Sequence, residues 1–203
     1  MSSAGLSRTS YAEYLRQEEL SDVRHEWCNG AVVAMARGTP EHSLLKKNLA
    51  WAIRSALANK PCIPFDVDLR VRVQATGLGT YPDLSVICDP MRVDDEDRNA
   101  AVNPTAIFEV LSPTTAGYDR GEKFDHYATI PSLRAYILVD HTRVHLDVYT
   151  PSADGSWARR GYGPGQRVRI EAIDAEIAVD DVYIRWSELR DQLAAEAQRL
   201  QTS

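Results

Sequence analysis

Residues 105–112, with the sequence TAIFEVLS, form an apolar run of the length of a buried strand, and Glu109 lies near its centre. No basic residue is adjacent to Glu109 along the chain. An ionised carboxylate is costly to remove from water unless a cation or hydrogen-bond donors accompany it, or it takes up a proton. The partner of Glu109 must therefore come from another part of the chain.

The length of 203 residues allows a single domain over residues 1–203, with a core over about 10–190 and a short C-terminal helix over 187–200. Apolar residues make up 44% of the chain and charged residues 26%, as in ordinary globular proteins. No apolar run reaches the roughly 18 residues of a membrane span, and the N-terminus lacks the apolar core of a signal peptide. We therefore expect a cytoplasmic protein with no membrane partner.

The formal net charge of −6 argues against binding of polyanions over the whole surface, because such binding needs clustered Lys and Arg. The 3 cysteines, Cys28, Cys62 and Cys88, are widely spaced and form no CxxC pair. This pattern favours neither a disulfide framework nor a structural zinc site. We expect all three cysteines to be reduced and buried.

The N-terminal half combines two helical segments with shorter extended ones. Residues 11–20 have a helix-forming composition, and residues 24–36 form two short arms around an Asn-Gly dipeptide, which is typical of a hairpin. Thr39 as a cap, followed by proline, predicts a helix start in residues 39–60, where apolar residues recur at helical spacing. Residues 65–73 alternate strictly between apolar and polar, which predicts one half-buried strand.

In the C-terminal half, residues 81–89 and 105–112 predict two strands that can pair across the acidic loop between them. Residues 116–129 have a helical pattern despite Gly121, which costs about 1 kcal/mol in a helix interior relative to alanine. Further strands are expected in residues 133–140 and 144–150, in a hairpin at 156–170 and in 173–186. The predicted architecture is α/β (α+β), a mixed β-sheet flanked by helices.

Asp83 follows a proline at the start of the first of these two strands, and Glu109 lies inside the second. If the strands are neighbours, the two carboxylates converge, and a metal ion would neutralise both. Mg²⁺ suits sites made of one or two carboxylates, waters and substrate phosphates, where it activates water and stabilises charge on a phosphodiester. The pair predicts a Mg²⁺ site, with Mn²⁺ as the expected substitute.

These segments resemble the PD-(D/E)XK nuclease superfamily and, more closely, its Uma-type group (Uma two) of restriction-endonuclease-like proteins. The resemblance is carried by YPDLSVICDP at 81–90, FEVLSPTTAGYDRGEKFDHY at 108–127, IPSLRAYILVD at 130–140 and HEWCNGAVVAMA at 25–36. It covers most of the chain. It implies a restriction-endonuclease-like fold, Asp83 and Glu109 as metal ligands, and hydrolysis of DNA as the activity.

The chain departs from the superfamily pattern at Leu111, which stands where a lysine is expected two residues after the acidic residue. In this group Lys123, on the following helix, resembles the replacement, and a lysine on a helix beside the strand can still bring its charge near a phosphate or an attacking water. Glu26 resembles the acidic residue that related nucleases supply from an N-terminal element. Ala31 stands where the group often has Glu, so the role of the hairpin stays open.

Each of these residues could instead have a purely structural role. Asp83 could only form a turn that opens a strand, and Lys123 could be an exposed partner of a carboxylate on its own helix. Glu26 could pair with Arg24 or His25 at a surface hairpin.

His42, in the first turn of the predicted helix, could be structural or contact DNA or a metal. Arg70 and Arg72, and a second set of arginines at 159, 160, 167 and 169, could contact phosphates or lie on solvated strand faces. The acidic loop at residues 94–97 is expected to be a solvated turn.

The leading hypothesis is a Mg²⁺-dependent endonuclease that hydrolyses DNA, with Asp83 and Glu109 on the metal, Lys123 at the attacking water and Glu26 assisting the metal shell. The first alternative is a catalytically inactive nuclease-like module that binds DNA or protein. The second is a hydrolase of a small phosphodiester. Cleavage of both strands of a duplex suits a two-fold arrangement, so a homodimer is expected.

Overall fold

The computed structural model describes residues 8–35 and 38–202. Its largest sheet is mixed and has six strands in the order β11-β10-β9-β8-β6-β3, in which β8 and β9 run parallel and the other neighbours antiparallel. These strands are β3 (Ile63–Asp66), β6 (Leu84–Ile87), β8 (Ala106–Val110), β9 (Ala135–Val139), β10 (Leu146–Pro151) and β11 (Trp157–Tyr162). The predicted pairing of the strands that carry Asp83 and Glu109 is confirmed, since β6 pairs with β8.

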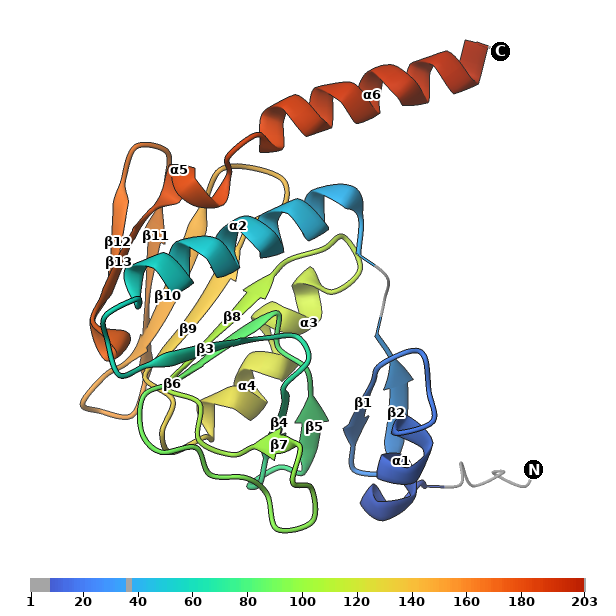
Figure 1. Cartoon of the computed structure of the whole chain (residues 1–203), viewed down its shortest axis with the longest axis vertical. Helices are drawn as coiled ribbons and strands as arrows, with labels where there is room; N and C mark the ends of the chain where they lie inside the picture. The colour runs from blue at the N-terminus through green and yellow to red at the C-terminus, as the bar shows by residue number, and fades with distance from the viewer. Residues whose placement is uncertain (1–7, 36–37, 203) are drawn as a thin grey trace.

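One face of this sheet is covered by α2 (Pro40–Ala56), as Figure 1 shows. The helix begins as predicted, because the Thr39 hydroxyl accepts a hydrogen bond from the His42 backbone N–H at 3.2 Å. Leu45, Leu49 and Ile53 lie on its buried side and pack against alternate residues of the sheet. Burial of this apolar stripe holds the N-terminal end of α2 close to β8.

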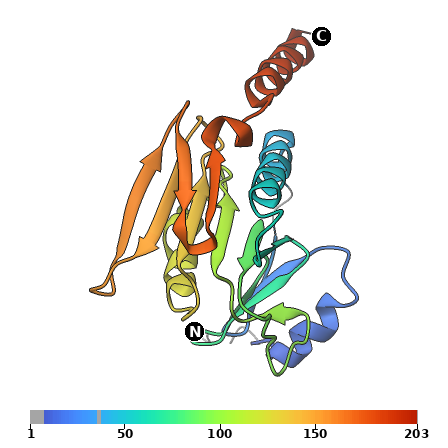
Figure 2. The ribbon, with the colours of Figure 1, turned by 60° about the vertical axis from the view of Figure 1, so that its left-hand side comes forward.

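The opposite face is covered by two short helices, α3 (Ala116–Arg120) and α4 (Glu122–Ala128). Figure 2 shows α2 and α4 on opposite sides of the sheet. The prediction of one helix over residues 116–129 is wrong at Gly121, whose φ of −121° and ψ of −103° end α3. The break redirects the chain, so that α4 places Lys123 and Tyr127 against the sheet, where both are buried.

A second sheet has the strand order β2-β1-β5-β4-β7. Its strands are β1 (His25–Cys28), β2 (Ala31–Ala34), β4 (Arg70–Val73), β5 (Leu78–Thr80) and β7 (Ala100–Ala101), and α1 (Tyr11–Glu18) precedes them. The predicted hairpin is confirmed, because β1 and β2 pair across Asn29 and Gly30, which both have positive φ. Residues 1–7 of the expected domain, Ala36 and Arg37 next to the hairpin, and Ser203 lie outside the described residues.

The prediction of one alternating strand over residues 65–73 is wrong. The segment divides into β3 and β4, which belong to different sheets. A turn separates them, in which an Asp66 side-chain oxygen accepts the Asp68 N–H at 3.1 Å and the Asp66 carbonyl accepts the Leu69 N–H at 3.2 Å. Alternation continues across this turn, so the pattern alone did not reveal it.

The C-terminal part differs from the prediction in one pairing and in one strand: the strand expected over residues 173–186 covers only Ala175–Ala178, and helices follow it. The expected hairpin at 156–170 is wrong, since β11 pairs with β10 while β12 (Arg167–Ile170) pairs with β13 (Ala175–Ala178). Between β12 and β13 lies η1 (Glu171–Ile173), and α5 (Val179–Val182) and α6 (Trp186–Thr202) follow. Figure 1 shows α6 projecting away from the sheets. Within the described ranges, no helix combines the length and the apolar character that crossing a membrane requires.

The expectation that every cysteine is reduced is wrong for two of them. Cys62 and Cys88 form a disulfide, whereas Cys28 is free. Cys62 directly precedes β3 and Cys88 directly follows β6, and antiparallel pairing of these strands brings the two residues opposite each other. Their sequence separation of 26 residues gave no sign of this proximity.

The acidic loop is solvated only in part, and Arg70 is buried and does not lie on a solvated strand face. In the acidic loop, Asp94 and Asp97 are buried, and the Asp97 carboxylate forms an ion pair with Arg70. Arg70 also donates to the Tyr81 hydroxyl, and the Arg72 guanidinium lies 3.7 Å from the centre of the Tyr11 ring. These two arginines therefore hold α1, β4 and the acidic loop together.

Candidate active site

The antiparallel pairing of β6 and β8 brings Asp83 and Glu109 together. Leu84 lies opposite Phe108, so the residues one step beyond, Asp83 and Glu109, face each other across the pair. The Asp83 N–H donates to Oε2 of Glu109 at 3.2 Å, and the Val110 N–H donates to Oδ2 of Asp83 at 2.8 Å. This reciprocal arrangement fixes both carboxylates at the same edge of the sheet.

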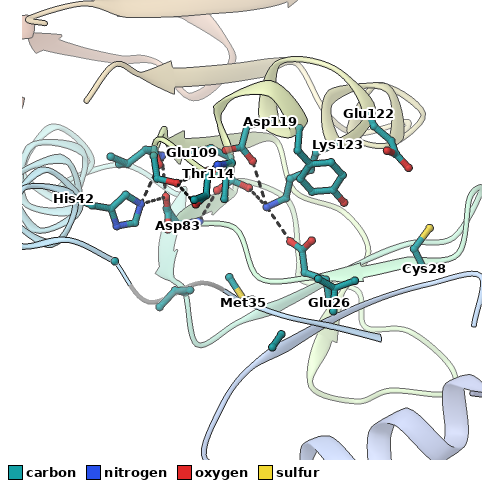
Figure 3. Close-up of a pocket in the computed structure, with 18 of the residues that line it drawn as sticks. Glu26, Cys28, Met35, His42, Asp83, Glu109, Thr114, Asp119, Glu122 and Lys123 are labelled. Carbon is teal, nitrogen blue, oxygen red and sulfur yellow. Dashed lines mark hydrogen bonds and ion pairs between the residues drawn. The ribbon is translucent and has the colours of Figure 1, made fainter. Parts of the chain in front are cut away.

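Lys123 is the main cation beside Glu109. Its Nζ atom lies 2.9 Å from Oε1 of Glu109, 3.0 Å from Oε1 of Glu26 and 3.8 Å from Oδ1 of Asp119. Figure 3 shows Lys123 between Glu26 and Asp119, with Glu122 pointing elsewhere. The alternative of an exposed lysine is wrong, because Lys123 is only 5% exposed.

Tyr127 is a third polar group around the Glu109 carboxyl, beside the Asp83 N–H and Lys123, and its sequence position alone did not predict this role. Its hydroxyl donates to Oε1 of Glu109 at 2.9 Å. Lys123 and Tyr127 are four residues apart, so the same face of α4 delivers both to one carboxylate. Leu111, which stands at the expected lysine position, is buried in the apolar cluster under α4 and contributes no charge.

Glu26 reaches the site from β1. Its Oε1 atom accepts a hydrogen bond from the Thr80 hydroxyl in addition to the Lys123 contact. The alternative of a surface pair with its neighbours is wrong, since Arg24 pairs with Asp68 and the His25 Nδ1 atom lies 2.9 Å from Glu18.

Asp83 contacts two basic side chains from α2, and only one of them was considered from the sequence. The Lys46 Nζ atom lies 2.8 Å from Oδ1 of Asp83, and the His42 Nε2 atom lies 3.4 Å from Oδ2. His42 Nε2 is also 2.9 Å from the Val110 carbonyl oxygen, which can only accept, so this nitrogen donates and is not free to bind a metal. The spacing of four between His42 and Lys46 on a helix was the signal available in the sequence.

The two carboxyl groups differ in their acidity because their surroundings differ. Burial by itself raises the pKa of Asp83, but the hydrogen bond from His42 and the charge of Lys46 lower it to about 2. Burial raises the pKa of Glu109 to about 8, because the loss of hydration outweighs the opposing charge of Lys123. Lys123 stays charged: burial disfavours its charge, yet Glu109 and its other anionic neighbours raise its pKa well above the usual value.

These residues line a cavity of about 1840 Å³ between the β1–β2 hairpin, the first turns of α2, and α3 and α4. Its lining contains six carboxylates and four ammonium or guanidinium groups: Glu26, Asp66, Asp83, Glu109, Asp119 and Glu122 against Arg8, Lys46, Lys47 and Lys123. The lining is therefore acidic, and a phosphodiester would be repelled unless cations accompanied it.

The donor set fits Mg²⁺ better than a metal held by the protein alone. In residues 8–35 and 38–202, no three His, Cys, Asp or Glu side chains are placed to hold one ion together. Mg²⁺ commonly uses one or two carboxylates and completes its shell with waters and substrate phosphates. Asp83 and Glu109 match that requirement, and they are the residues that would hold the ion.

The fold is that of the restriction-endonuclease-like nucleases. A crystal structure described as a "putative nuclease belonging to DUF820", from Anabaena variabilis, matches with a TM-score of 0.69 over 86% of this chain and 96% of that chain. The sequence identity of 19% is low, so this likeness concerns the fold. Residues 11–180 match the model of the Uma2 family, described as "Putative restriction endonuclease", and the chain belongs to this family.

Two proteins of Synechocystis sp. are similar in sequence. The "Uncharacterized protein slr1290" is 36% identical over 181 residues, which is 89% of this chain and 94% of that protein. The "Uncharacterized protein sll1609" is 32% identical over 146 residues, which is 72% of this chain and 82% of that protein. The match to the family model over residues 11–180 confirms the expected family.

Proposed function

We propose that this protein is a divalent-metal-dependent endonuclease that hydrolyses phosphodiester bonds of DNA. The observation that carries the proposal is the placement of Asp83 and Glu109 side by side, with the Lys123 Nζ atom 2.9 Å from Glu109. Two carboxylates and an ammonium group are the parts that metal-assisted attack of water on a phosphodiester needs. Membership of the Uma2 family and the nuclease-like fold support the same reaction class.

Mg²⁺ is the proposed cofactor, with Mn²⁺ as a substitute. When bound, it would supply Lewis acidity and a more acidic water. The cavity lining has more carboxyl groups than ammonium and guanidinium groups, and a divalent cation would offset this excess of acidic groups.

Each residue has a defined role in the proposal. Asp83 and Glu109 hold the ion, and the hydrogen bonds that the Asp83 and Val110 N–H groups donate to these two carboxyl groups keep their spacing constant. Lys123 orients the attacking water and offsets the negative charge that develops on the phosphate. Glu26 and Asp119 hold the Lys123 ammonium in place, and Tyr127 holds Glu109.

The test begins with calorimetric titration of Mn²⁺ into the wild type and into Asp83→Asn and Glu109→Gln. Binding to the wild type that either substitution abolishes supports the two-carboxylate site. The same three proteins are then incubated with supercoiled plasmid and Mg²⁺, and only the wild type should nick or linearise it. Metal-dependent cleavage retained by Asp83→Asn would overturn the assignment.

The rival function, a nuclease-like module without catalysis, is favoured by one observation: the carboxyl groups of Glu26, Asp83 and Glu109 each already have a cationic or hydroxyl partner within the protein. Such a module should bind DNA equally well with a chelator and with Mg²⁺. A hydrolase of small phosphodiesters would instead cleave a generic chromogenic phosphodiester and leave DNA intact.

A homodimer is part of the proposal, because two active sites related by a two-fold axis suit the antiparallel strands of a duplex. The hairpins and α6 are the candidate contact regions. Sedimentation at micromolar concentration tests this point, and a monomer mass with full cleavage activity would contradict it.

A further inference from the structure

The two lysines of the site differ in how firmly they are held. Lys123 is 5% exposed and contacts Glu26, Glu109 and Asp119, so three carboxyl groups hold its ammonium in place. The Lys46 side chain is 26% exposed and forms an ion pair with one carboxylate, that of Asp83. Lys46 can therefore leave its partner at much lower cost than Lys123 can.

Within the described residues, the carboxylate that pairs with Lys46 belongs to a proposed metal ligand, Asp83. Its Nζ atom lies 2.8 Å from Oδ1 of Asp83, while Oδ2 is engaged by the Val110 N–H at 2.8 Å. Oδ1 is thus the oxygen of Asp83 that Lys46 covers and that a cation would approach. A divalent ion on Asp83 and the Lys46 ammonium would compete for it, because both neutralise the same charge.

The position of Lys46 gives it a second destination. It lines the cavity one turn after His42, on the side formed by α2. Its long side chain carries a compact charge on four rotatable carbons, which suits contact with a phosphate as a point charge.

We propose that Lys46 exchanges partners: it neutralises Asp83 in the metal-free protein and, once a divalent ion occupies Asp83, binds a phosphate of the DNA backbone. Lys46 is then a substrate-binding residue whose availability depends on the metal. The inference rests on the proposed function and adds to it an order of events, in which metal binding prepares the site for DNA.

This exchange would make DNA binding conditional on metal for two separate reasons. The ion reduces the repulsion between the acidic lining and the phosphates, and it also frees a positive charge that was previously paired. A lysine that merely lies on the surface contributes the same attraction with or without metal. Lys47, the next residue of α2, is exposed, lines the cavity and provides this comparison.

The experiment measures two affinities for the wild type, Lys46→Gln and Lys47→Gln. The first is that of Mn²⁺ alone, by calorimetry. The second is that of a short random-sequence duplex, with a chelator and with Ca²⁺, a larger ion that also takes oxygen ligands, chosen to slow hydrolysis. Each DNA affinity is measured at several salt concentrations, because the slope counts phosphate contacts.

For Lys46→Gln we expect Mn²⁺ to bind at least as tightly as to the wild type, since a competing cation is removed. DNA in Ca²⁺ should bind about tenfold more weakly, with a salt slope lower by about one phosphate contact, while in chelator the loss should be much smaller. Lys47→Gln should leave Mn²⁺ affinity unchanged and change DNA affinity equally in both conditions. Lys46→Arg, which keeps the charge, should restore most of the DNA affinity and also controls for folding.

The exchange is overturned if Lys46→Gln loses the same DNA affinity with and without metal, loses none, or binds Mn²⁺ more weakly. In those cases the wild type still binds DNA in a metal-dependent way, so the proposed nuclease function stands. If the wild type itself shows no metal-dependent DNA binding, both proposals fail together.

Discussion

The Nζ atom of Lys123 lies 2.9 Å from Oε1 of Glu109, although Lys123 belongs to α4 and Glu109 to β8. The strand position from which a lysine was expected holds Leu111, which is buried in an apolar cluster. The ammonium group therefore comes from α4 and not from the strand, and it contacts the Glu109 carboxyl from there.

Lys123→Met should lower the free energy of unfolding by about 3–5 kcal/mol, because three carboxyl groups in a buried site would lose the ammonium that they share. Urea unfolding measures this change. The double variant Lys123→Met with Glu109→Gln should recover part of the loss, since one of the buried carboxyl groups left without the ammonium is then a neutral amide that needs no proton to stay uncharged. Lys47→Met, at an exposed position, is the matched control and should change stability by less than about 0.5 kcal/mol.

Tyr127→Phe should lower the free energy of unfolding by about 1 kcal/mol, because it removes one hydrogen bond to Glu109 while Lys123 remains beside that carboxylate. The rate of plasmid cleavage should fall by more than the small loss of folded protein explains, since Glu109 is then held by fewer contacts. The comparison of plasmid cleavage with urea unfolding separates the two effects. Tyr149→Phe provides a control, because Tyr149 lies in the aromatic cluster around Phe124 instead of at the site.

The affinity for Mn²⁺ should rise with pH up to about 8 and then become constant. Below its pKa of about 8 the Glu109 carboxyl is neutral, so binding of a cation must release a proton. The expected slope is up to tenfold in affinity for each pH unit between about 6 and about 8. Asp83, whose pKa is about 2, adds nothing in this range because it is already ionised.

Calorimetry in two buffers of different ionisation enthalpy measures the released proton directly. One proton per bound ion at neutral pH, decreasing above about pH 8, is the expected result. An affinity that does not change between pH 6 and pH 8 would contradict the raised pKa of Glu109.

Thiol titration of the unfolded protein should detect one free thiol without reductant, that of Cys28, and three with reductant. The bond between Cys62 and Cys88 closes a loop with a sequence separation of 26 residues, so replacing both cysteines by alanine should lower the free energy of unfolding by about 3 kcal/mol. Under reducing conditions, the free energies of unfolding of this double variant and of the wild type should differ much less. Three free thiols before reduction would show that this disulfide does not form.

Local patterns were sufficient for several elements. Thr39 with the following proline predicted the start of α2, and the Asn-Gly dipeptide predicted the turn between β1 and β2. These signals succeed because a cap or a turn depends on a few adjacent residues. Residues 65–73 had an equally regular pattern and misled, since the turn after Asp66 preserves the alternation while moving the chain to another sheet.

By itself, the sequence determined that a carboxylate lies within a buried strand and needs a partner, because the cost of desolvating Glu109 is a property of that apolar run. It also determined the family, through long blocks of matching residues. Only the tertiary structure decided which partners Asp83 and Glu109 obtain. Lys46 and Lys123 come from helices on opposite faces of the sheet, and the packing of those helices sets which charges meet at its edge.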